Sequence, residues 1–144
     1  MILPLTEKDF YLLACAKDCG YTDEWEQTVL SSSLKSGNFY GFKAEIENEF
    51  SGYVHYSTSI DAMDINSVFV FPNFRKKGIA EKLLNAVIGD AKERKIDKIF
   101  LEVRESNTPA IKLYEKLGFK IISERKKYYK NGETAKIMLK EILL

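Results

Sequence analysis

The sequence predicts an α+β fold, in which helices pack on the faces of a mixed β-sheet. Residues 68–71 form an unbroken apolar run, typical of a strand buried on both faces, and a short basic loop and a helical pattern follow them. A second strand pattern at residues 98–104 is followed by a helical pattern that begins at a proline. Strand patterns joined by polar turns stand on either side of these two units, so the predicted order is β-α-α-β-β-β-α-β-α-β-β.

Length and composition are those of an ordinary soluble domain. The 144 residues, 45% of them hydrophobic and 30% charged, suffice for a single domain with its own core, and we place no boundary within residues 1–144. A formal net charge of +1 argues against a polyanion-binding surface, so no nucleic-acid partner is expected. No apolar run approaches the roughly 20 residues that span a bilayer, and residues 1–4 lack signal-peptide architecture, so no membrane partner is expected.

The chain carries few metal-ligating side chains. Cys15 and Cys19 would share one face of a helix, and His55 is the single histidine. A zinc site needs about four ligands, so no metal is expected, and His55 is assigned no role. Free thiols in a reducing compartment are the better interpretation of the cysteines, and we expect a cytoplasmic protein.

The first elements are predicted from proline, caps and glycine. Residues 2–5 indicate an edge strand because they include Pro4, which cannot donate to a central ladder. Thr6 can cap a helix with Asp9 three residues on, and Gly20 supplies its end.

The next segment predicts a second helix and then strands. A helical pattern begins at Thr22 and fades before the strand pattern of Phe39–Ile46. A polar turn at residues 47–49 leads into a strand at 50–57. Residues 61–64 then turn the chain into the central strand.

Residues 68–81 are predicted to be a strand, a loop and the start of a helix. Pro72 ends the strand because it has no N–H to donate. The loop at 75–78, Arg-Lys-Lys-Gly, precedes a helix whose first N–H groups point outward, which makes it a candidate anion site. Gly78 lets the backbone approach a ligand closely, whereas a solvated charge run before an ordinary helix is the alternative. The helix presents an apolar stripe of Ala80, Leu83, Leu84, Val87, Ile88 and Ala91.

The strand at residues 98–104 carries a candidate general base. Alternation places Glu102 on one face with Phe100 and Arg104. A carboxylate at a cleft can take a proton from an amine, directly or through water. The alternative is a surface glutamate paired with a lysine, since glutamates are mostly exposed.

A second helix and two strands complete the chain. Residues 106–109, Ser-Asn-Thr-Pro, start a helix that Gly118 ends. Strands at 119–123 and 135–142 follow, joined by a hairpin turn at Asn131-Gly132. The helix carries on one side Ala110, Leu113, Tyr114 and Leu117. On spacing alone Tyr114 is a packing residue, although a buried phenol still requires a hydrogen-bond partner.

The basic loop resembles the acetyl-CoA signature of one enzyme family. The letters R-K-K-G-I-A at residues 75–80 are similar to the R/Q-x-x-G-x-G/A pattern of the GNAT acyltransferase superfamily, where it also lies between a buried strand and a long helix. The resemblance implies a GNAT-like, mostly antiparallel sheet and acetyl-CoA as co-substrate. It implies that loop amides bind the pyrophosphate and that strand backbone groups at 68–70 hold the pantetheine arm. The implied cofactor-binding residues are Val68, Phe69, Val70, Arg75, Lys76, Lys77, Gly78, Ile79, Ala80, Glu81 and Asn107.

Two downstream segments resemble the ribosomal-protein alanine N-acetyltransferase group of this superfamily. They are L-E-V-R-E-S-N at residues 101–107 and A-I-K-L-Y-E-K-L-G-F at residues 110–119. The resemblance implies that Glu102 is the catalytic base, that Tyr114 is the acid that protonates the thiolate leaving group, and that Asn107 contacts the cofactor.

The segment Y-Y-K-N-G-E-T-A at residues 128–135 resembles the Y-Y-x-x-G-E-D-A stretch of protein α-amino acetyltransferases, with Thr134 in place of the aspartate. The resemblance implies that Tyr128 and Tyr129 hold a peptide N-terminus. A hairpin with aromatic flanks and no function is the alternative.

The predicted function is therefore that of an acetyl-CoA-dependent N-acetyltransferase acting on a primary amine. We expect direct transfer in a ternary complex, because neither cysteine lies in a catalytic motif. The expected acceptor is the N-terminal α-amino group of a protein such as a ribosomal protein. A small amine, a polyamine or a lysine is an alternative acceptor, and a non-catalytic acyl-CoA-binding module is an alternative function, since fold does not fix function.

Overall fold

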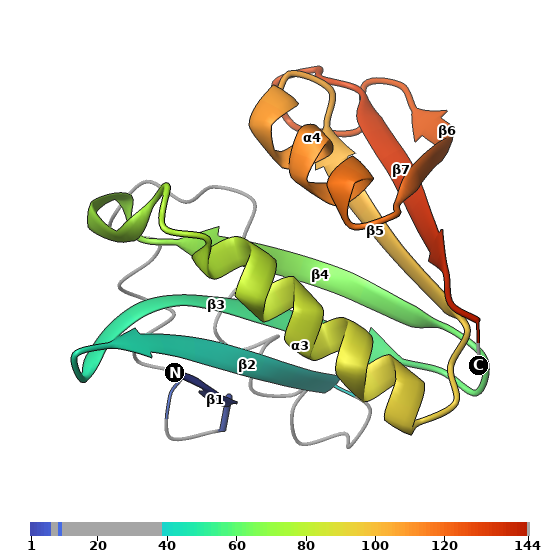
Figure 1. Ribbon diagram of the computed structural model, residues 1–144. Coiled ribbons are helices and arrows are strands. Elements are labelled where there is room, and N and C mark those ends of the chain that lie inside the picture. Colours follow the sequence, from blue (N-terminus) through green and yellow to red (C-terminus); the bar gives the residue numbers. More distant parts are fainter. Residues whose placement is uncertain (7–8, 10–38, 144) are drawn as a thin grey trace.

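The computed structural model describes residues 1–6, 9 and 39–143. Their strands form one seven-stranded sheet in the order β1-β2-β3-β4-β5-β7-β6. Neighbouring strands are antiparallel except β4 and β5, which are parallel and connected through helix α3 (Figure 1). This confirms the predicted α+β class with a mixed, mostly antiparallel sheet. The two helices predicted within residues 6–37 lie outside the described residues, as do both cysteines.

The element boundaries agree with the predicted order from residue 39 onward. Strand β1 lies at one edge of the sheet, as its proline predicts, and β6 lies at the other. Within the described part of the chain, no helix is long and apolar enough to cross a membrane. The elements are β1 (Ile2–Pro4), β2 (Phe39–Ile46), β3 (Glu49–Thr58), β4 (Met63–Val70), the 3-10 helix η2 (Pro72–Phe74), α3 (Ile79–Glu93), β5 (Lys98–Arg104), α4 (Thr108–Lys116), β6 (Lys120–Arg125) and β7 (Ala135–Glu141).

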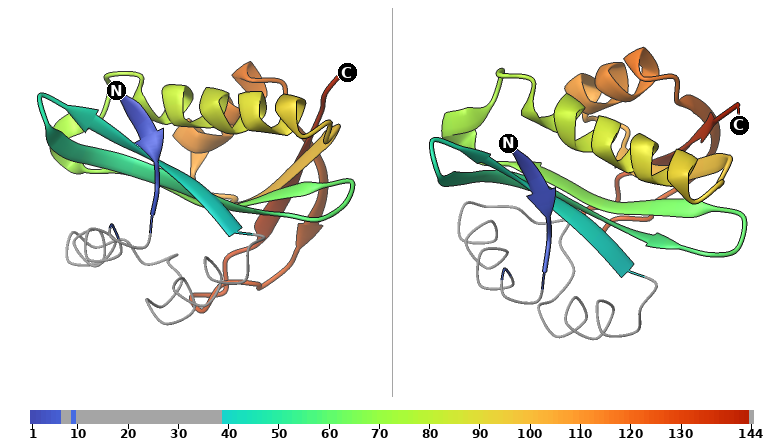
Figure 2. Two further views of the ribbon diagram at one scale, coloured as in Figure 1. Left: turned by 90° about the horizontal axis from the view of Figure 1, so that it is seen from below. Right: turned by 60° about the horizontal axis from the view of Figure 1, so that its bottom comes forward.

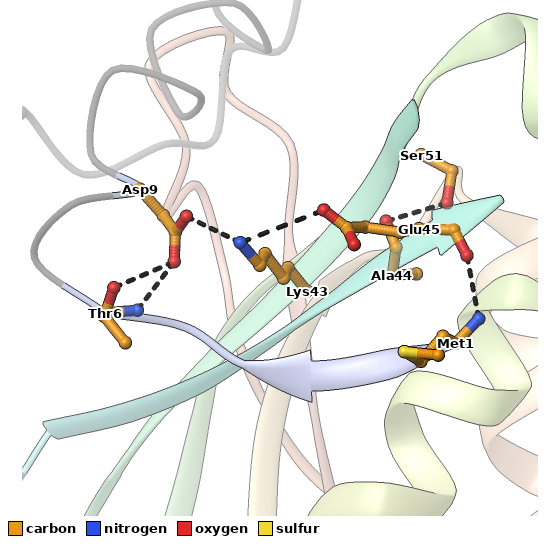
Figure 3. Close-up of polar contacts among 7 residues, drawn as sticks. All are labelled: Met1, Thr6, Asp9, Lys43, Ala44, Glu45 and Ser51. Atoms are coloured by element: carbon orange, nitrogen blue, oxygen red, sulfur yellow. Dashed lines mark hydrogen bonds and ion pairs between the residues drawn. The ribbon is translucent and has the colours of Figure 1, made fainter. Parts of the chain in front are cut away.

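Polar contacts fasten the N-terminal edge strand to its neighbour (Figure 3). The terminal ammonium of Met1 donates to the Glu45 carbonyl over 2.7 Å, and Lys43 forms an ion pair of 2.8 Å with Asp9. The backbone N–H and the hydroxyl of Thr6 donate to the same Asp9 carboxylate over 2.9 and 3.1 Å, which is a contact expected at a helix start. Burial by itself would raise the pKa of Asp9, but hydrogen bonds from Lys43 and Thr6 lower it.

Both described helices pack on the same face of the sheet (Figure 2). The predicted apolar stripe of α3 is confirmed except at its first position, where Ile79 is buried and Ala80 only half-buried. The far half of α3 is tied to the sheet by the Tyr56 hydroxyl, which donates to Asp90 over 2.7 Å. The buried stripe consists of Ile79, Leu83, Leu84, Val87, Ile88 and Ala91.

A β-bulge in β4 changes which side chains face the helices. Strand β3 pairs with Ile65 and then with Ser67, which leaves Asn66 as an extra residue. Ile65 therefore packs toward α3 before the bulge, and Val68 and Val70 do so after it. An uninterrupted alternation would have placed these valines on the opposite face.

Strands β4 and β5 separate soon after they meet (Figure 1). They pair only over Met63–Ile99, Asp64–Phe100 and Ile65–Leu101, after which β4 continues beside β3 and β5 beside β7. The prediction that residues 68–71 are buried on both faces is wrong for this reason: Val68 and Val70 are only half-buried. Beyond the bulge, β4 has no strand neighbour on its β5 side within the described ranges.

The predicted hairpin at Asn131-Gly132 exists, but its turn is longer than a two-residue turn. Strands β6 and β7 pair up to Arg125 and Ala135, so residues 126–134 form the loop. The Asn131 side chain accepts hydrogen bonds from the Glu133 N–H, over 3.0 Å, and from Arg104, over 3.1 Å. The asparagine therefore fastens the loop to β5, and only Gly132 of the pair has a positive φ, at 86°.

Candidate active site

The open edge of β4 offers backbone groups for hydrogen bonding. The Phe71 N–H donates to a β3 carbonyl over 2.9 Å. Because successive residues of a strand point their backbone groups in opposite directions, Phe69 also turns toward β3, whereas Val68 and Val70 turn away from it. The Val70 carbonyl accepts from Arg75 Nε over 3.0 Å. An extended ligand arm along this edge would meet the backbone of Val68 and Val70. The Phe69 backbone groups point toward β3, so their predicted contact with the arm is less direct.

The loop before α3 has the geometry of an anion site. Lys76 and Gly78 adopt positive φ angles of 64° and 76°, which turn successive backbone groups toward one side. Among the residues that the structure describes, a Cβ at Gly78 would meet nothing within 4 Å, and no side chain caps the helix there. The N–H groups of Ile79, Ala80 and Glu81 lie in the first turn, where helical partners are missing. This open, uncapped helix start fits a pyrophosphate.

Two charged side chains of this region already contact other parts of the protein. The Arg75 guanidinium lies 5.8 Å from the ring centre of Phe69. The same guanidinium donates through Nε to the Val70 carbonyl of β4. The Glu81 carboxylate pairs with Lys116 over 3.1 Å and so connects the start of α3 with the end of α4. The contribution expected of Glu81 to an anion site is therefore that of its backbone N–H.

Helix α4 begins at Asn107 as the sequence predicts. The Asn107 side-chain oxygen accepts from the Ala110 N–H over 3.3 Å, an N-cap contact. This contact explains why an asparagine precedes the helix. The cofactor contact implied for Asn107 stays a prediction.

The end of α4 positions Tyr114. The Phe119 N–H donates to the Tyr114 carbonyl over 2.9 Å and the Gly118 N–H donates to the Glu115 carbonyl over 3.0 Å, which together form a Schellman motif. The Tyr114 ring packs edge-on against Phe119 with ring centres 5.9 Å apart. Burial of the phenol, and then the nearby phenol of Tyr129, raise the pKa of Tyr114 to about 12. Tyr114 is therefore protonated at neutral pH and able to donate.

Glu102 points away from the two helices, on the face predicted from strand alternation. The β5 residues on either side of it, Leu101 and Val103, are buried in the core beneath the helices. The Glu102 carboxylate lies 3.3 Å from Nη1 of Arg125, a residue of β6. Both side chains reach solvent. Glu102 is thus available to an incoming amine, with a cationic neighbour.

The loop between β6 and β7 places two tyrosines beside this region. Tyr128 and Tyr129 pack edge to face with ring centres 5.3 Å apart. The Arg125 guanidinium lies 5.4 Å from the Tyr128 ring, and that of Arg104 lies 3.9 Å from the Tyr129 ring. These contacts link Tyr129, which interacts with Tyr114, to the Arg125 that pairs with Glu102. A chain of contacts through Arg125 therefore connects the residues predicted to be catalytic or substrate-binding, which are Glu102, Tyr114, Tyr128 and Tyr129.

Comparisons with known proteins identify the family. Residues 4–119 match the Acetyltransferase (GNAT) family. The chain belongs to this family. It is 32% identical over 129 residues to the [ribosomal protein bS18]-alanine N-acetyltransferase of Haemophilus ducreyi, covering 90% of this chain and 88% of that one. It is 36% identical over 110 residues to the N-alpha-acetyltransferase of Sulfurisphaera tokodaii, covering 67% and 66%. The crystal structure of the ribosomal-protein-S18-alanine N-acetyltransferase from Escherichia coli superposes with a TM-score of 0.92 at 25% identity, covering 100% and 94%.

This GNAT protein is accordingly an N-acetyltransferase, and acetyl-CoA is the acetyl donor of its family. The separated strands β4 and β5 and the uncapped start of α3 belong to a fold shared with those relatives.

Sequence reasoning gives no role to three charged residues that lie near the predicted catalytic and acceptor residues. Arg104 was placed on the correct face of β5 but given no role, and it binds Glu133 over 3.0 Å beneath Tyr129. Arg125 and Asp64 come from β6 and β4, and their approach to Glu102 depends on strand pairing that no local pattern predicts.

Proposed function

We propose that this GNAT enzyme transfers acetyl from acetyl-CoA to the N-terminal α-amino group of a protein or peptide, such as a ribosomal protein. The observation that carries the proposal is the placement of Tyr128 and Tyr129 by two arginines beside Glu102 and Tyr114. Two phenols at the mouth of the acceptor site suit the backbone of a peptide N-terminus. The bS18-alanine N-acetyltransferase activity named for the Haemophilus ducreyi relative supports the same acceptor class.

The proposed binding mode uses the open edge of β4 and the start of α3. Backbone groups of Val68 and Val70 hold the pantetheine arm as an added strand would. Amides from Lys76 to Glu81 bind the pyrophosphate at the helix N-terminus. The thioester of acetyl-CoA supplies the activated acetyl group. Arg75, Lys77 and Asn107 complete the proposed cofactor contacts.

In the proposed reaction, Glu102 removes a proton from the bound ammonium, directly or through water, and leaves a neutral amine. The Tyr114 phenol donates toward the departing sulfur. Transfer occurs directly between the two bound substrates, with no acetylated protein side chain. An α-ammonium has an ordinary pKa of about 7.7–8.0, against about 10.4 for lysine, so a single carboxylate removes its proton far more readily.

The test compares two peptides of one sequence, one with a free N-terminus and blocked lysine, the other with these reversed. We expect the free-N-terminus peptide to be at least tenfold better in kcat/KM, since it presents the more acidic ammonium and its backbone can hydrogen-bond to the two phenols. Tyr129→Ala should reduce that margin, and Tyr129→Phe separates the effect of the hydroxyl from that of the ring. Equal rates on both peptides, or acetylation of spermidine-like amines alone, would contradict the proposal and favour a small-amine acceptor.

A further inference from the structure

Asp64 lies beside Glu102 on the face of the sheet opposite α3 and α4. Asp64 pairs with Phe100 in the parallel ladder between β4 and β5, and Glu102 follows two residues later. The neighbours Met63 and Ile65 are buried beneath the helices, so Asp64 points to the same side as Glu102. Diagonal neighbours on one face of a sheet are roughly 7–8 Å apart at Cα, within reach of carboxylate side chains that lean together.

The two carboxylates interact, although Asp64 reaches solvent. Partial burial, and then the charge of Glu102, raise the pKa of the Asp64 carboxyl. The strand positions directly opposite are Ser57 on β3 and Ile137 on β7, neither of which titrates.

Among the described residues, two arginines lie near this pair. Arg125 of β6 lies 3.3 Å from Glu102, and Arg104 is the next residue of β5 on the same face. Arg104 forms an ion pair with Glu133 over 3.0 Å, whereas Arg125 forms one with Glu102 over 3.3 Å. Of these two arginines, Arg125 is the one that pairs with Glu102, and two carboxylates on one face of the sheet favour the arrival of a further positive charge or of a proton.

We propose that Asp64 is a positioning residue for proton removal: with Glu102 it forms a carboxylate pair that takes up one proton from the acceptor ammonium. This rests on the proposed function and deepens it. One N–H bond of the ammonium breaks, one O–H bond forms on the pair, and the electron pair left on nitrogen becomes available to attack the thioester. The proton leaves to water after transfer. Burial and the charge of Glu102 raise the pKa of the Asp64 carboxyl, so the pair holds a proton more readily than an isolated aspartate would.

The proposal is tested by the pH dependence of kcat at saturating substrates, with a free-N-terminus peptide as acceptor. Asp64→Asn should move the acid limb of the profile to lower pH by at least about half a pH unit, because the remaining carboxylate loses its negative neighbour. Above the limb, kcat should fall at least about threefold, since the remaining base is weaker. Asp64→Glu restores a carboxylate and should return the limb toward its wild-type position.

Asp61→Asn is the matched control, because it removes the same charge from the exposed turn before β4. It should leave the profile unchanged, and calorimetry should show wild-type acetyl-CoA binding by the Asp64→Asn protein. An unmoved limb in Asp64→Asn, or an equal shift in Asp61→Asn, overturns the proposal. Absence of transfer to any α-amine by the wild-type enzyme would instead count against the proposed function.

Discussion

The Tyr114 phenol is held protonated by its surroundings, and this limits the chemistry that it can perform. Burial and the neighbouring Tyr129 raise its pKa to about 12. An ordinary thiol has a pKa of about 8.5, so complete proton transfer from this phenol to a departing thiolate is uphill. A short hydrogen bond to the developing negative charge is the contribution that such a phenol makes most readily. The carbonyl and ring contacts with Phe119 fix the direction of that donor.

Replacing the two proposed catalytic side chains should reduce turnover and spare cofactor binding. Glu102→Gln removes the base and Tyr114→Phe removes the donor, so each should lower kcat by roughly 10²–10⁴-fold. Steady-state kinetics at saturating substrates measures the loss, and calorimetry measures acetyl-CoA affinity. Glu105→Gln, an exposed glutamate just beyond β5, is the control and should keep wild-type kcat. A variant within about twofold of wild type, with chemistry limiting, would remove that residue from the mechanism.

For single residues, the local sequence pattern predicts which face of an element a side chain occupies, but not which side chains of other elements it contacts. The face of Glu102 follows from alternation within seven residues of one strand. Its ion pair with Arg125 and its position near Asp64 require β5 to lie beside β4 and near β6, and that pairing is set by the whole sheet. Ile79 is buried where the sequence predicts Ala80, because the rotation of α3 about its axis against the sheet decides which residue of its first turn faces the core.

At the scale of elements, the strand–loop–helix unit from β4 to α3 positions the proposed cofactor site. The bulge at Asn66 directs Val68 and Val70 toward the helix face, and after the separation from β5 no described strand pairs with their backbone groups on that side. Gly78 then starts α3 with a φ of 76°, a conformation that glycine adopts without strain. The sequence predicted the strand, the loop and the helix, but neither the bulge nor the separation, because both depend on how three strands pair.

An acidic side chain at the start of α3 should weaken acetyl-CoA binding. Gly78→Glu places a negative charge in the open space before the helix and strains the positive φ, so calorimetric affinity should fall at least about tenfold, or ~1.4 kcal/mol. Gly89→Glu adds the same charge to the same helix, also in open space, about 16 Å away along the axis, and should bind normally. Unchanged affinity in a folded Gly78→Glu protein would place the anion site elsewhere.

The turn of the β6–β7 hairpin is also predicted in position but not in its contacts with other strands. Asn131-Gly132 correctly predicts that the chain reverses there. The loop is longer, since strand pairing ends at Arg125 and Ala135, and within it the Asn131 side chain bonds to Glu133 and to Arg104 of β5. The Arg104 guanidinium also lies 3.9 Å from the Tyr129 ring centre. The contacts of Arg104, which the Asn-Gly pattern does not predict, are therefore the ones that position Tyr129 in the proposed acceptor region.

At the scale of the whole molecule, the sheet consists of two halves joined at one place. Strands β1 to β4 carry α3, and β5 to β7 carry α4, while β4 and β5 share only three residue pairs. The ion pair between Glu81 and Lys116 connects the two helices across the separation. Glu102 and Tyr114 lie on the β5–β7 half, whereas Asp64 and most of the proposed cofactor contacts lie on the β4–α3 half. Transfer therefore depends on how rigidly the joint between the halves is held.

The stability of the whole molecule should depend on pH through its single histidine. His55 is 0% exposed, stacks on Tyr53 with ring centres 5.9 Å apart, and burial lowers its pKa to about 3. Above about pH 6.5 neither the folded nor the unfolded state binds a proton at this side chain, so its contribution is fully present. Between about pH 6.5 and the pKa of His55 in the folded state, only the unfolded state binds the proton, so the free energy of unfolding falls as the pH falls.

Urea unfolding followed by circular dichroism should show a loss of about 2 kcal/mol in the free energy of unfolding between pH 7 and pH 5. His55→Phe keeps a stacking ring and should abolish most of that loss, since no other histidine titrates in this range; a variant with the wild-type pH dependence would assign the loss to other groups.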